Sequence, residues 1–498
     1  MNTAYATTSN ESYFTDAINH LNALITELQS EILAQMEHGD IEQHINQQGH
    51  EIMRRLFQGH LDLLAANEEQ TSVVTSNGVK PLNHIRQDTQ RTLGSQFGKV
   101  KVTRKSYGQR NEASQFPLDK HLNLADSSYS DGLIQHVVLE ALKGSFDNAV
   151  ESIDRTTAGH TPKRQSLELV HDVSQDFEAY YQQNRFRLPE DTNDLLVLTF
   201  DGKGVVMRKE GLRECTRKNT EKSNKLESRL SPGEKKDRKR MAMVAAVYTV
   251  TPHERTAQSV MNLELENERV LPFRAPVRNK RVWASLEREA EDVIREAFEE
   301  ARQRDPEQKR TWVILIDGLP HQIRMINKVK SEMNLEATIV MDFIHVLEYL
   351  WKAAWCFFEK GDPLAEEWIA ERSVKILQGK CAQVAKGIRQ SATKRGVDNR
   401  EGIDKCASYL LNNKSRLQYG EALNKGFPIA SGVIEGACRH LINDRLDITG
   451  SRWSLPGAEA VLKIRSLKSS GDFESYWRFH KEQSKKRLYG NFKQECEI

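Results

Sequence analysis

Apolar side chains near the start of the chain recur at the spacing of a helix. Five of them lie three and four residues apart: Ile18, Leu21, Ile25, Leu28 and Ile32. This is the a/d pattern of a helical seam, but it lasts only about two heptads, and a coiled coil usually needs three or four. Residues 1–97 are therefore expected to form a helical region. Its seam either packs within its own domain or joins two copies of the chain.

A different period begins at Gly98. From Gly98 to Tyr107, Val100 and Val102 alternate with lysine and threonine, which predicts a strand with one basic face. That face either lies in solvent or contacts phosphate groups.

Two helical segments joined by a short turn follow within residues 98–187. Ala158-Gly159-His160 can form the turn, Thr161 is a suitable N-cap, and Pro162 suits the first helical position. The second helix would then display three side chains at its start: Lys163, Arg164 and Gln165. Base-reading side chains occupy this place in a DNA-binding helix-turn-helix. We expect such a unit here, and a helical hairpin that binds nothing is the alternative.

From Leu195 the pattern becomes that of an α/β protein. Continuous apolar runs predict four buried strands: Leu195–Phe200, Met241–Val250, Thr311–Ile316 and Ala337–Met341. Trp283–Arg302 has helical spacing. Buried strands with a helical crossover imply that part of the sheet is parallel.

The rest of the chain is predicted to be helical or irregular. Residues 346–428 show no strand pattern, and Leu455–Ser469 form a helix within residues 429–470. Residues 471–498 are polar and aromatic, and the pattern assigns them no role.

Composition narrows the classes of protein that fit. The chain has 498 residues, more than one compact domain, and 72 Lys and Arg against 70 Asp and Glu give a net charge of only +2. A histone-like polycation is excluded, so affinity for nucleic acid must come from local basic patches. The longest apolar run, Met241–Val250, is about half of the roughly 20 residues that span a bilayer, and Met1-Asn2-Thr3-Ala4 does not open a signal peptide. The six cysteines form no C-x-x-C pair, which indicates reduced thiols in a cytosol and argues against zinc.

Positive charge is concentrated between the first two predicted strands. Lys203–Arg240 holds eight Lys and six Arg against six acidic residues, a local net charge of +8. Phosphate groups need such local neutralisation, so the stretch is expected to line a DNA groove, with a solvated hairpin as the alternative. The candidate contacts are Lys203, Lys235, Lys236, Lys239 and Arg240.

Acidic residues follow the predicted strands. Asp201, Asp317 and Asp342 each come directly after an apolar run. If the strand Leu195–Phe200 borders the strand Thr311–Ile316, Asp201 and Asp317 come close together, and two adjacent carboxylates are costly unless a cation lies between them. Oxygen ligands suit Mg²⁺, and a third carboxylate, Glu435, would complete a two-metal site for phosphodiester chemistry.

These segments carry a resemblance to a known family. They are Thr199–Val206, Leu315–Gly318, Asp342–His345, Ser431–Gly436, Thr449–Ser454 and Gly457–Ala460. Over about residues 98–470 the chain resembles bacterial insertion-sequence transposases of the DDE type, most of all the Kra-type group (ISKra family), a relative of the Mutator-like transposases. Relatives often carry paired cysteines after a strand like Gly98–Tyr107, and Gly108–Glu112 has none here, so no zinc is expected.

The resemblance implies a fold and an activity. The fold is an α/β RNase H-like catalytic core (residues 188–345 and 429–470) with an all-α insertion domain (residues 346–428), preceded by the mostly helical region that contains the helix-turn-helix. Asp201, Asp317 and Glu435 would be the catalytic residues and would hold two Mg²⁺ ions, for which Mn²⁺ can substitute. The partners would be double-stranded DNA, both the terminal inverted repeats and the target, and at least one further copy of the chain.

The expected reaction is metal-dependent cleavage and strand transfer at the ends of a mobile element in the bacterial cytosol, at the nucleoid. The alternatives are a domesticated, non-catalytic DNA-binding regulator and a structure-selective nuclease without strand transfer. Three further residues are expected near the site. Asp342 is a structural hydrogen-bond acceptor or an auxiliary ligand, and His345 orients its helix or donates to a phosphate. Trp453, which follows the candidate DNA contact Arg452, is a core plug or a stacking platform for a base.

Overall fold

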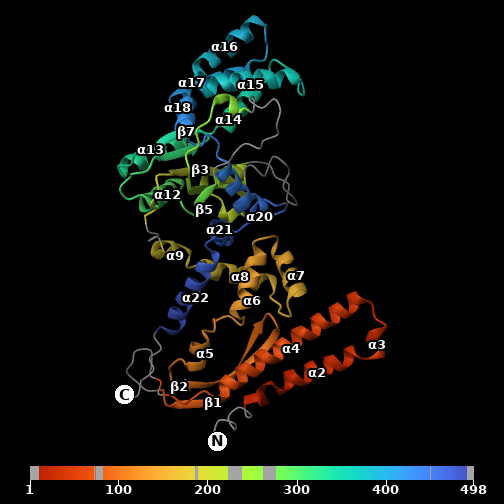
Figure 1. The fold of residues 1–498 in the computed structure, drawn as a ribbon. Coiled ribbons are helices and arrows are strands. Elements are labelled where there is room, and N and C mark those ends of the chain that lie inside the picture. The colour runs from red at the N-terminus through yellow and green to blue at the C-terminus, as the bar shows by residue number, and fades with distance from the viewer. Residues whose placement is uncertain are drawn as a thin grey trace. The chain divides into compact units, whose positions relative to one another are not determined.

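The computed structural model describes residues 10–71, 73, 82–184, 189–222, 238–261, 276–448 and 450–490. The chain divides into two compact units, which are described separately (Figure 1). Unit 1 consists of Met1–Tyr180 together with Glu474–Ile498, and unit 2 of Tyr181–Phe473.

Unit 1 begins with a helical hairpin. Its elements are η1 (Glu11–Phe14), α2 (Thr15–Leu28), α3 (Glu31–Ala34) and α4 (His38–Ala66). The pairs Arg55–Asp16 and His44–Glu27 show that α2 and α4 run antiparallel. Ala17 and Leu24 are the buried side chains of α2. The five seam residues lie elsewhere on the helix surface and are exposed, so the seam does not form the core of its own domain.

An antiparallel pair of strands packs on α4. It consists of β1 (His84–Ser95) and β2 (Gly98–Gly108), and Leu61 of α4 joins Leu93, Val100 and Val102 in one apolar cluster. The strand predicted from Gly98 is confirmed. The expectation that the first 97 residues are helical is wrong from His84 onward, because β1 exposes most of its side chains and so shows no alternating apolar pattern.

Five helices follow in order: α5 (Pro117–Leu122), α6 (Asp131–Ala141), α7 (Phe146–Thr156), α8 (Lys163–Ser174) and α9 (Phe177–Asn184). The predicted helix–turn–helix corresponds to α7 and α8, which both pack on α6. One detail of the prediction is wrong: Pro162 occupies the N-cap of α8, and its first helical residue is Lys163. The hydroxyl of Thr161 is buried without a hydrogen-bond partner and does not cap the helix.

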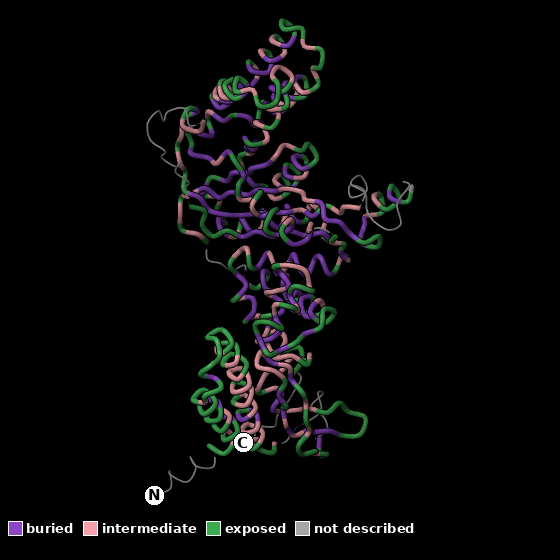
Figure 2. The backbone as a smooth tube through the Cα atoms, turned by 90° about the vertical axis from the view of Figure 1, so that its right-hand side faces the viewer, coloured by how far each residue is buried: buried purple, intermediate pink, exposed green. Residues whose placement is uncertain are grey.

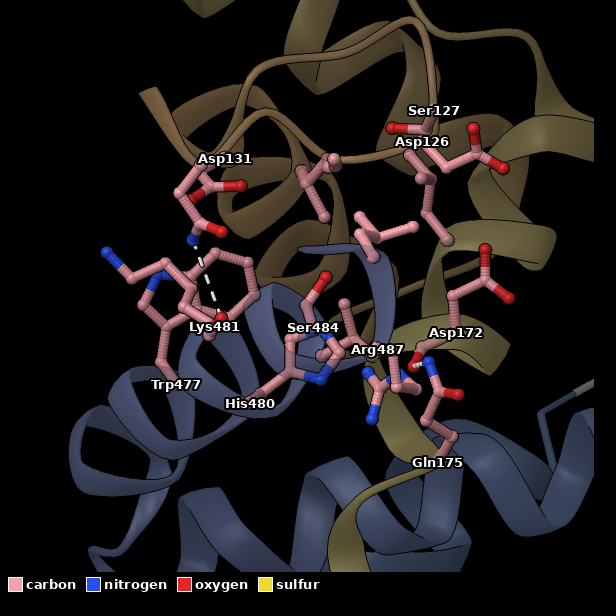
Figure 3. A pocket seen from close by; sticks show the side chains of 16 residues that line it. Asp126, Ser127, Asp131, Asp172, Gln175, Trp477, His480, Lys481, Ser484 and Arg487 are labelled. Atoms are coloured by element: carbon pink, nitrogen blue, oxygen red, sulfur yellow. Dashed lines mark hydrogen bonds between the residues drawn. The ribbon is translucent and has the colours of Figure 1, made fainter. Parts of the chain in front are cut away.

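The C-terminal segment forms α22 (Phe473–Tyr489), most of which belongs to unit 1. The Tyr476 hydroxyl donates to the Val173 carbonyl, and Asp176 accepts from Arg487 and pairs with His480. Figure 3 shows α22 side chains beside α6 and α8 around a cavity of about 150 Å³. Residues to which the sequence pattern assigned no role therefore close the core of the helix-turn-helix.

Unit 2 contains a five-stranded mixed sheet in the order β5-β4-β3-β6-β7. The strands are β3 (Leu195–Val206), β4 (Lys239–Val250), β5 (Val277–Ser285), β6 (Trp312–Ile316) and β7 (Thr338–Met341). β3 pairs antiparallel with β4 and parallel with β6, so the strand before Asp201 does border the strand before Asp317. The parallel portion of the sheet is confirmed, and the strands are largely buried (Figure 2).

Two boundaries in unit 2 differ from the predictions. β3 continues six residues beyond Phe200, because its outer half still pairs with β4. Val277–Ser285 is a strand, and the following helix, α12, spans Ala290–Arg304, so Trp283 lies in the sheet and not in a helix. The first four residues of this strand are exposed and mostly polar, and the buried Arg281 follows them, so only a short apolar run remains in the sequence. Glu296 and Glu300 of α12 neutralise Arg281.

Helices make up the rest of unit 2. Those before and beside the sheet are η2 (Lys209–Gly211), α10 (Glu214–Lys222), α11 (Ala257–Val260), α12 and α13 (Pro320–Glu332). Those after β7 are α14 (Phe343–Ala354), α15 (Pro363–Leu377), α16 (Cys381–Lys394), α17 (Glu401–Asn412), η4 (Lys414–Arg416) and α18 (Tyr419–Asn424). The last are α19 (Gly432–Ala437), the π-helical turn η5 (Cys438–Asn443), α20 (Asp444–Leu446) and α21 (Leu455–Ser470), which packs on β5.

Within the described ranges, every helix is too short or too polar to cross a bilayer. The described cysteines are free thiols: Cys215, Cys356, Cys381, Cys406 and Cys438.

Candidate active site

Two acidic residues meet at the edge of the sheet where β3 and β6 leave their parallel pairing. The pairing runs from Leu196 to Thr199, which lies opposite Leu315. Continuing that register by two residues places Asp201 level with Asp317. Since parallel strands present their carboxyl ends at one edge, both carboxyl groups belong to the same site.

Asp201 is held by a backbone amide and a thiol. Its Oδ1 accepts from the Gly202 amide at 2.6 Å, and its Oδ2 accepts from Cys438 Sγ at 3.1 Å. Burial, together with the negative charge of Asp201, holds the pKa of Cys438 well above its usual value. The thiol is therefore protonated at neutral pH and donates to the carboxylate.

Asp317 follows β6 and pairs with a histidine. His345 Nε2 lies 3.0 Å from Asp317 Oδ2, and His345 Nδ1 lies 3.5 Å from Glu348 Oε2. The hydrogen bond to Asp317 raises the pKa of His345 to about 9 against the opposing effect of burial, so the ring is an imidazolium at neutral pH. Gly318 has φ +91°, a conformation that is strained for residues with a Cβ, so the backbone favours glycine beside Asp317.

Asp342 is fully buried and acts as a tether. It caps α14 through Oδ1, which accepts from the Ile344 amide at 2.7 Å. Its Oδ2 accepts from the Ser431 amide at 2.9 Å and from the Ser431 hydroxyl. The Phe343 amide also donates to the Ile429 carbonyl at 2.8 Å. These bonds fix the segment that leads into α19. The geometry is that of the structural acceptor, the favoured of the two roles expected for Asp342.

Glu435 lies on α19, which packs against β3 and β4. Partial burial raises its pKa, and the negative charges of Asp342, Asp317 and Asp201 raise it further, while His345 lowers it. The structure thus brings all the acidic residues predicted for the site into one electrostatic neighbourhood.

The side chains do not form a ready ligand set. Among the described residues, no three His, Cys, Asp or Glu side chains form a group that could hold a metal ion. The expectation that Asp201, Asp317 and Glu435 converge within metal-bridging reach is therefore not met by these side-chain positions. Their oxygen donors and mutual repulsion do fit Mg²⁺ in kind.

Two cavities open beside these carboxylates. One, of about 930 Å³, runs from Asp317 between α13 and α17 and is lined by Arg324, Arg416 and Tyr409, whose hydroxyl donates to the Asp317 carbonyl. The other, of about 570 Å³, is lined by Glu435, Tyr248 and the loop before α19. A substrate can therefore approach the carboxylates from two directions.

The predicted base-reading residues lie at the start of α8. Lys163 pairs with Asp147 at 2.6 Å, and Arg164 pairs with Glu168 at 3.0 Å while its side chain stays 90% exposed. Gln165 accepts from the Tyr129 hydroxyl. All three are held by neighbours, and the ion pairs are exposed enough to exchange for other partners.

The predicted phosphate contacts fall in different environments. Lys235 and Lys236 lie outside the described residues. Lys203 is close enough to Cys438 to lower its pKa against the raising effects of burial and Asp201, which places this cation at the site. Lys239 lies 3.7 Å from Asp447. Arg240 donates to the carbonyls of Leu286 and Gly211, a structural arrangement that its prediction as a DNA contact did not anticipate.

Trp453 is a packing residue in this structure. Its side chain is buried, its Nε1 donates to the Leu446 carbonyl at 3.1 Å, and the Arg445 guanidinium covers the ring. Its backbone pairs with Val206 at the end of β3. The geometry is that of the core plug rather than the stacking platform, whereas the preceding Arg452 is exposed.

The sequence analysis missed one side chain of the site, Cys438, and one contact, that between His345 and Asp317. Cys438 was available as a signal, since it follows Glu435 by three residues and so shares its helix face. The contact between His345 and Asp317 had no such signal, because the two residues lie on separate elements.

Comparisons with known proteins give little further information. No protein-family model matches the chain, and no curated protein matches its sequence. Among solved structures, the chain is similar to the "Drosophila P element transposase strand transfer complex", with 10% sequence identity over 71% of this chain and 80% of that chain and a TM-score of 0.22. At this TM-score, neither fold nor function can be argued from the likeness.

Proposed function

We propose that this chain is a DDE-type transposase whose mixed sheet is an RNase H-like core. It would bind the ends of an insertion sequence and catalyse metal-dependent cleavage and strand transfer. One observation carries the proposal: acidic residues from positions as distant as Asp201 and Glu435 gather at one sheet edge, where burial raises the pKa of Glu435 and the negative charges raise it further. Like charges that lie close together repel and destabilise a fold, so the needs of stability do not explain this cluster of carboxylates.

In this proposal Asp201, Asp317 and Glu435 are the ligands, and Mg²⁺ supplies charge neutralisation for phosphodiester chemistry. Asp342 is excluded from the ligand set, because its oxygens already accept from Ile344 and Ser431. Cys438 and His345 hold Asp201 and Asp317 in place in the free protein.

The DNA would be held by both units. The exposed start of α8, with Lys163 and Arg164, is the candidate reader of the terminal repeats. Lys203, Lys239 and Arg452 are candidate phosphate contacts in unit 2. The helices between β7 and α19 would be the all-α insertion domain and would border the cavity that begins at Asp317.

The test is an incubation of the full chain with Mg²⁺ and a plasmid that carries the flanking inverted repeats, with cleaved and joined products resolved on a gel. Asp317→Asn and Glu435→Gln should abolish both products and leave binding to the repeats unchanged. Asp398→Asn and Glu366→Gln are matched controls, because both side chains are exposed and line neither of the two cavities beside the carboxylates. Full activity of Asp317→Asn would contradict the proposal. Specific binding by a wild-type chain that never cleaves would favour the non-catalytic regulator.

A further inference from the structure

The α2–α4 hairpin carries an unusual concentration of exposed apolar side chains. Nine of them are between 36% and 79% exposed: Ile18, Leu21, Ile25, Leu28, Ile32, Met36, Ile45, Met53 and Leu56. Figure 2 shows how much of this hairpin is exposed. Single exposed apolar residues need no explanation, but a run of them on one element indicates a contact surface.

The exposed residues of the two helices face the same way. On α2 the contacts with α4 are made by Asp16, His20 and Glu27, and the exposed residues from Ile18 to Leu28 lie about 140° further round the helix in the direction of the chain. On α4 the partners of these contacts are Gln48, His44 and Arg55, and its exposed apolar residues are offset in the same sense by about 110°. Because the helices run antiparallel, offsets in the same sense fall on one side of the pair. The two stripes therefore lie on the same side of the hairpin.

The size of this face suits a dimer. Complete burial of a large aliphatic side chain removes roughly 60–120 Å² of apolar surface from water. At the upper value, the exposed fractions of the seven residues on α2 and α4 correspond to about 360 Å², and Ile32 and Met36, which lie between these helices, bring the total to about 500 Å². A standard interface buries about 800 Å² per partner, of which about 65% is apolar in homodimers, or about 520 Å².

The charge of the hairpin limits what can cover it. Residues 15–66 contain eight Asp and Glu against two Arg and no Lys. Phosphate groups of DNA and anionic lipid headgroups are repelled by such a surface. The apolar stripe itself carries no charge, as in the centre of a protein–protein interface.

We propose that the outer face of α2 and α4 is a dimer interface whose partner is a second copy of this chain. Two hairpins related by a twofold axis place four helices together, which is a stable packing for amphipathic helices. The proposal does not depend on the transposase activity and requires no DNA.

The excess of acidic side chains on the hairpin gives this dimer a distinctive response to salt. Like charges on the two hairpins repel, and salt screens them, with a Debye length that falls from about 10 Å at 0.1 M to about 3 Å at 1 M. The dimer should become tighter as salt rises. An association bridged by DNA would weaken instead.

The experiment is sedimentation velocity on the nucleic-acid-free full chain at micromolar concentrations, at low and high salt. Wild type should dimerise, more tightly at high salt. Ile25→Asp with Leu56→Asp should weaken the dimer at least about 100-fold, since each change acts twice per dimer and places a charge in the apolar face. Leu364→Asp is the matched control, because this leucine is exposed on α15 in unit 2, and it should leave the dimer intact.

Wild type that stays monomeric at tens of micromolar would overturn the proposal. So would a dimer that the double variant leaves unchanged, since another surface, or another segment lying on this one, would then be responsible. If the double variant melts at a lower temperature than wild type, Ile25→Ala with Leu56→Ala replaces it, because alanine keeps the helix. That pair should weaken the dimer at least about tenfold, and an unchanged affinity would refute the interface.

Discussion

Replacing Asp342 by alanine tests whether this residue is a tether or a metal ligand. The side chain is fully buried and accepts from the amides of Ile344 and Ser431 and from the Ser431 hydroxyl. Hydrogen bonds to a charged group contribute about 1.5–3 kcal/mol each. Removing the carboxylate also relieves its repulsion with Glu435, which offsets part of the loss. We expect Asp342→Ala to lower the free energy of unfolding of unit 2 by about 3–5 kcal/mol.

Urea unfolding followed by tryptophan fluorescence measures this loss, because six of the seven tryptophans lie in residues 181–473. Ser431→Ala removes only the hydroxyl donor and should cost about 1–2 kcal/mol. The double variant should lose less stability than the sum of the losses in the two single variants, since both changes remove the same hydrogen bond. Asp342→Ala with stability within about 0.5 kcal/mol of wild type and no DNA cleavage would refute the reasoning and make Asp342 a ligand.

The remaining predictions concern packing, pH and DNA. Trp453→Ala should cost unit 2 about 3–5 kcal/mol by urea unfolding, because it empties a buried site, and unchanged stability would contradict the role of a plug. Burial alone would raise the pKa of Glu300, but Arg281 and Arg304 lower it to about 2, below its value of 4.5 in the unfolded chain. The stability from this group is therefore present above about pH 4.5 and lost as pH falls toward about 2. Glu300→Gln should flatten that dependence and cost about 3 kcal/mol at neutral pH, and a wild-type stability that does not change over this interval would count against the ion network. Arg164→Ala should reduce the preference for the terminal repeats more than the affinity for unrelated DNA, measured by competition binding, and an equal loss on both would exclude α8 as the reader.

The success of the strand predictions has a physical reason. Trp312–Ile316 and Leu195–Phe200 are buried on both faces, so each appears in the sequence as a continuous apolar run. The adjacency of β3 and β6 was then enough to bring Asp201 and Asp317 to one edge. A strand with mostly exposed side chains, such as β1, has no apolar run and so cannot be predicted in this way.

Other features depend on contacts between distant parts of the chain. Val277–Ser285 was missed because its first four residues are exposed and mostly polar, and because Arg281 is compatible with a buried strand only once Glu296 and Glu300 lie beside it. The helix α22 was missed because its polar positions, such as His480, are satisfied by Asp176, which is 304 residues earlier. Sequence periodicity describes one element at a time and cannot contain such pairings.

In the candidate site, too, the sequence pattern locates residues but does not show which partners they have. Asp201, Asp317 and Asp342 look equivalent in the sequence, since each follows an apolar run. The structure separates them by what neutralises each one. Asp342 has amide and hydroxyl donors on both oxygens and is satisfied as a structural group. Asp317 is paired with the imidazolium of His345, and Asp201 has a neutral thiol and one amide.

Negative charge is therefore least compensated at Asp201 and Glu435, and next at Asp317, where a single residue, His345, supplies the opposing charge. Burial raises the pKa of Glu435, and the charges of Asp342, Asp317 and Asp201 raise it further. A cation at this sheet edge would relieve that repulsion and would take its ligands from Asp201, Asp317 and Glu435, because both oxygens of Asp342 already accept hydrogen bonds. These contacts are the reason that we propose this triad, and not Asp342, as the ligand set.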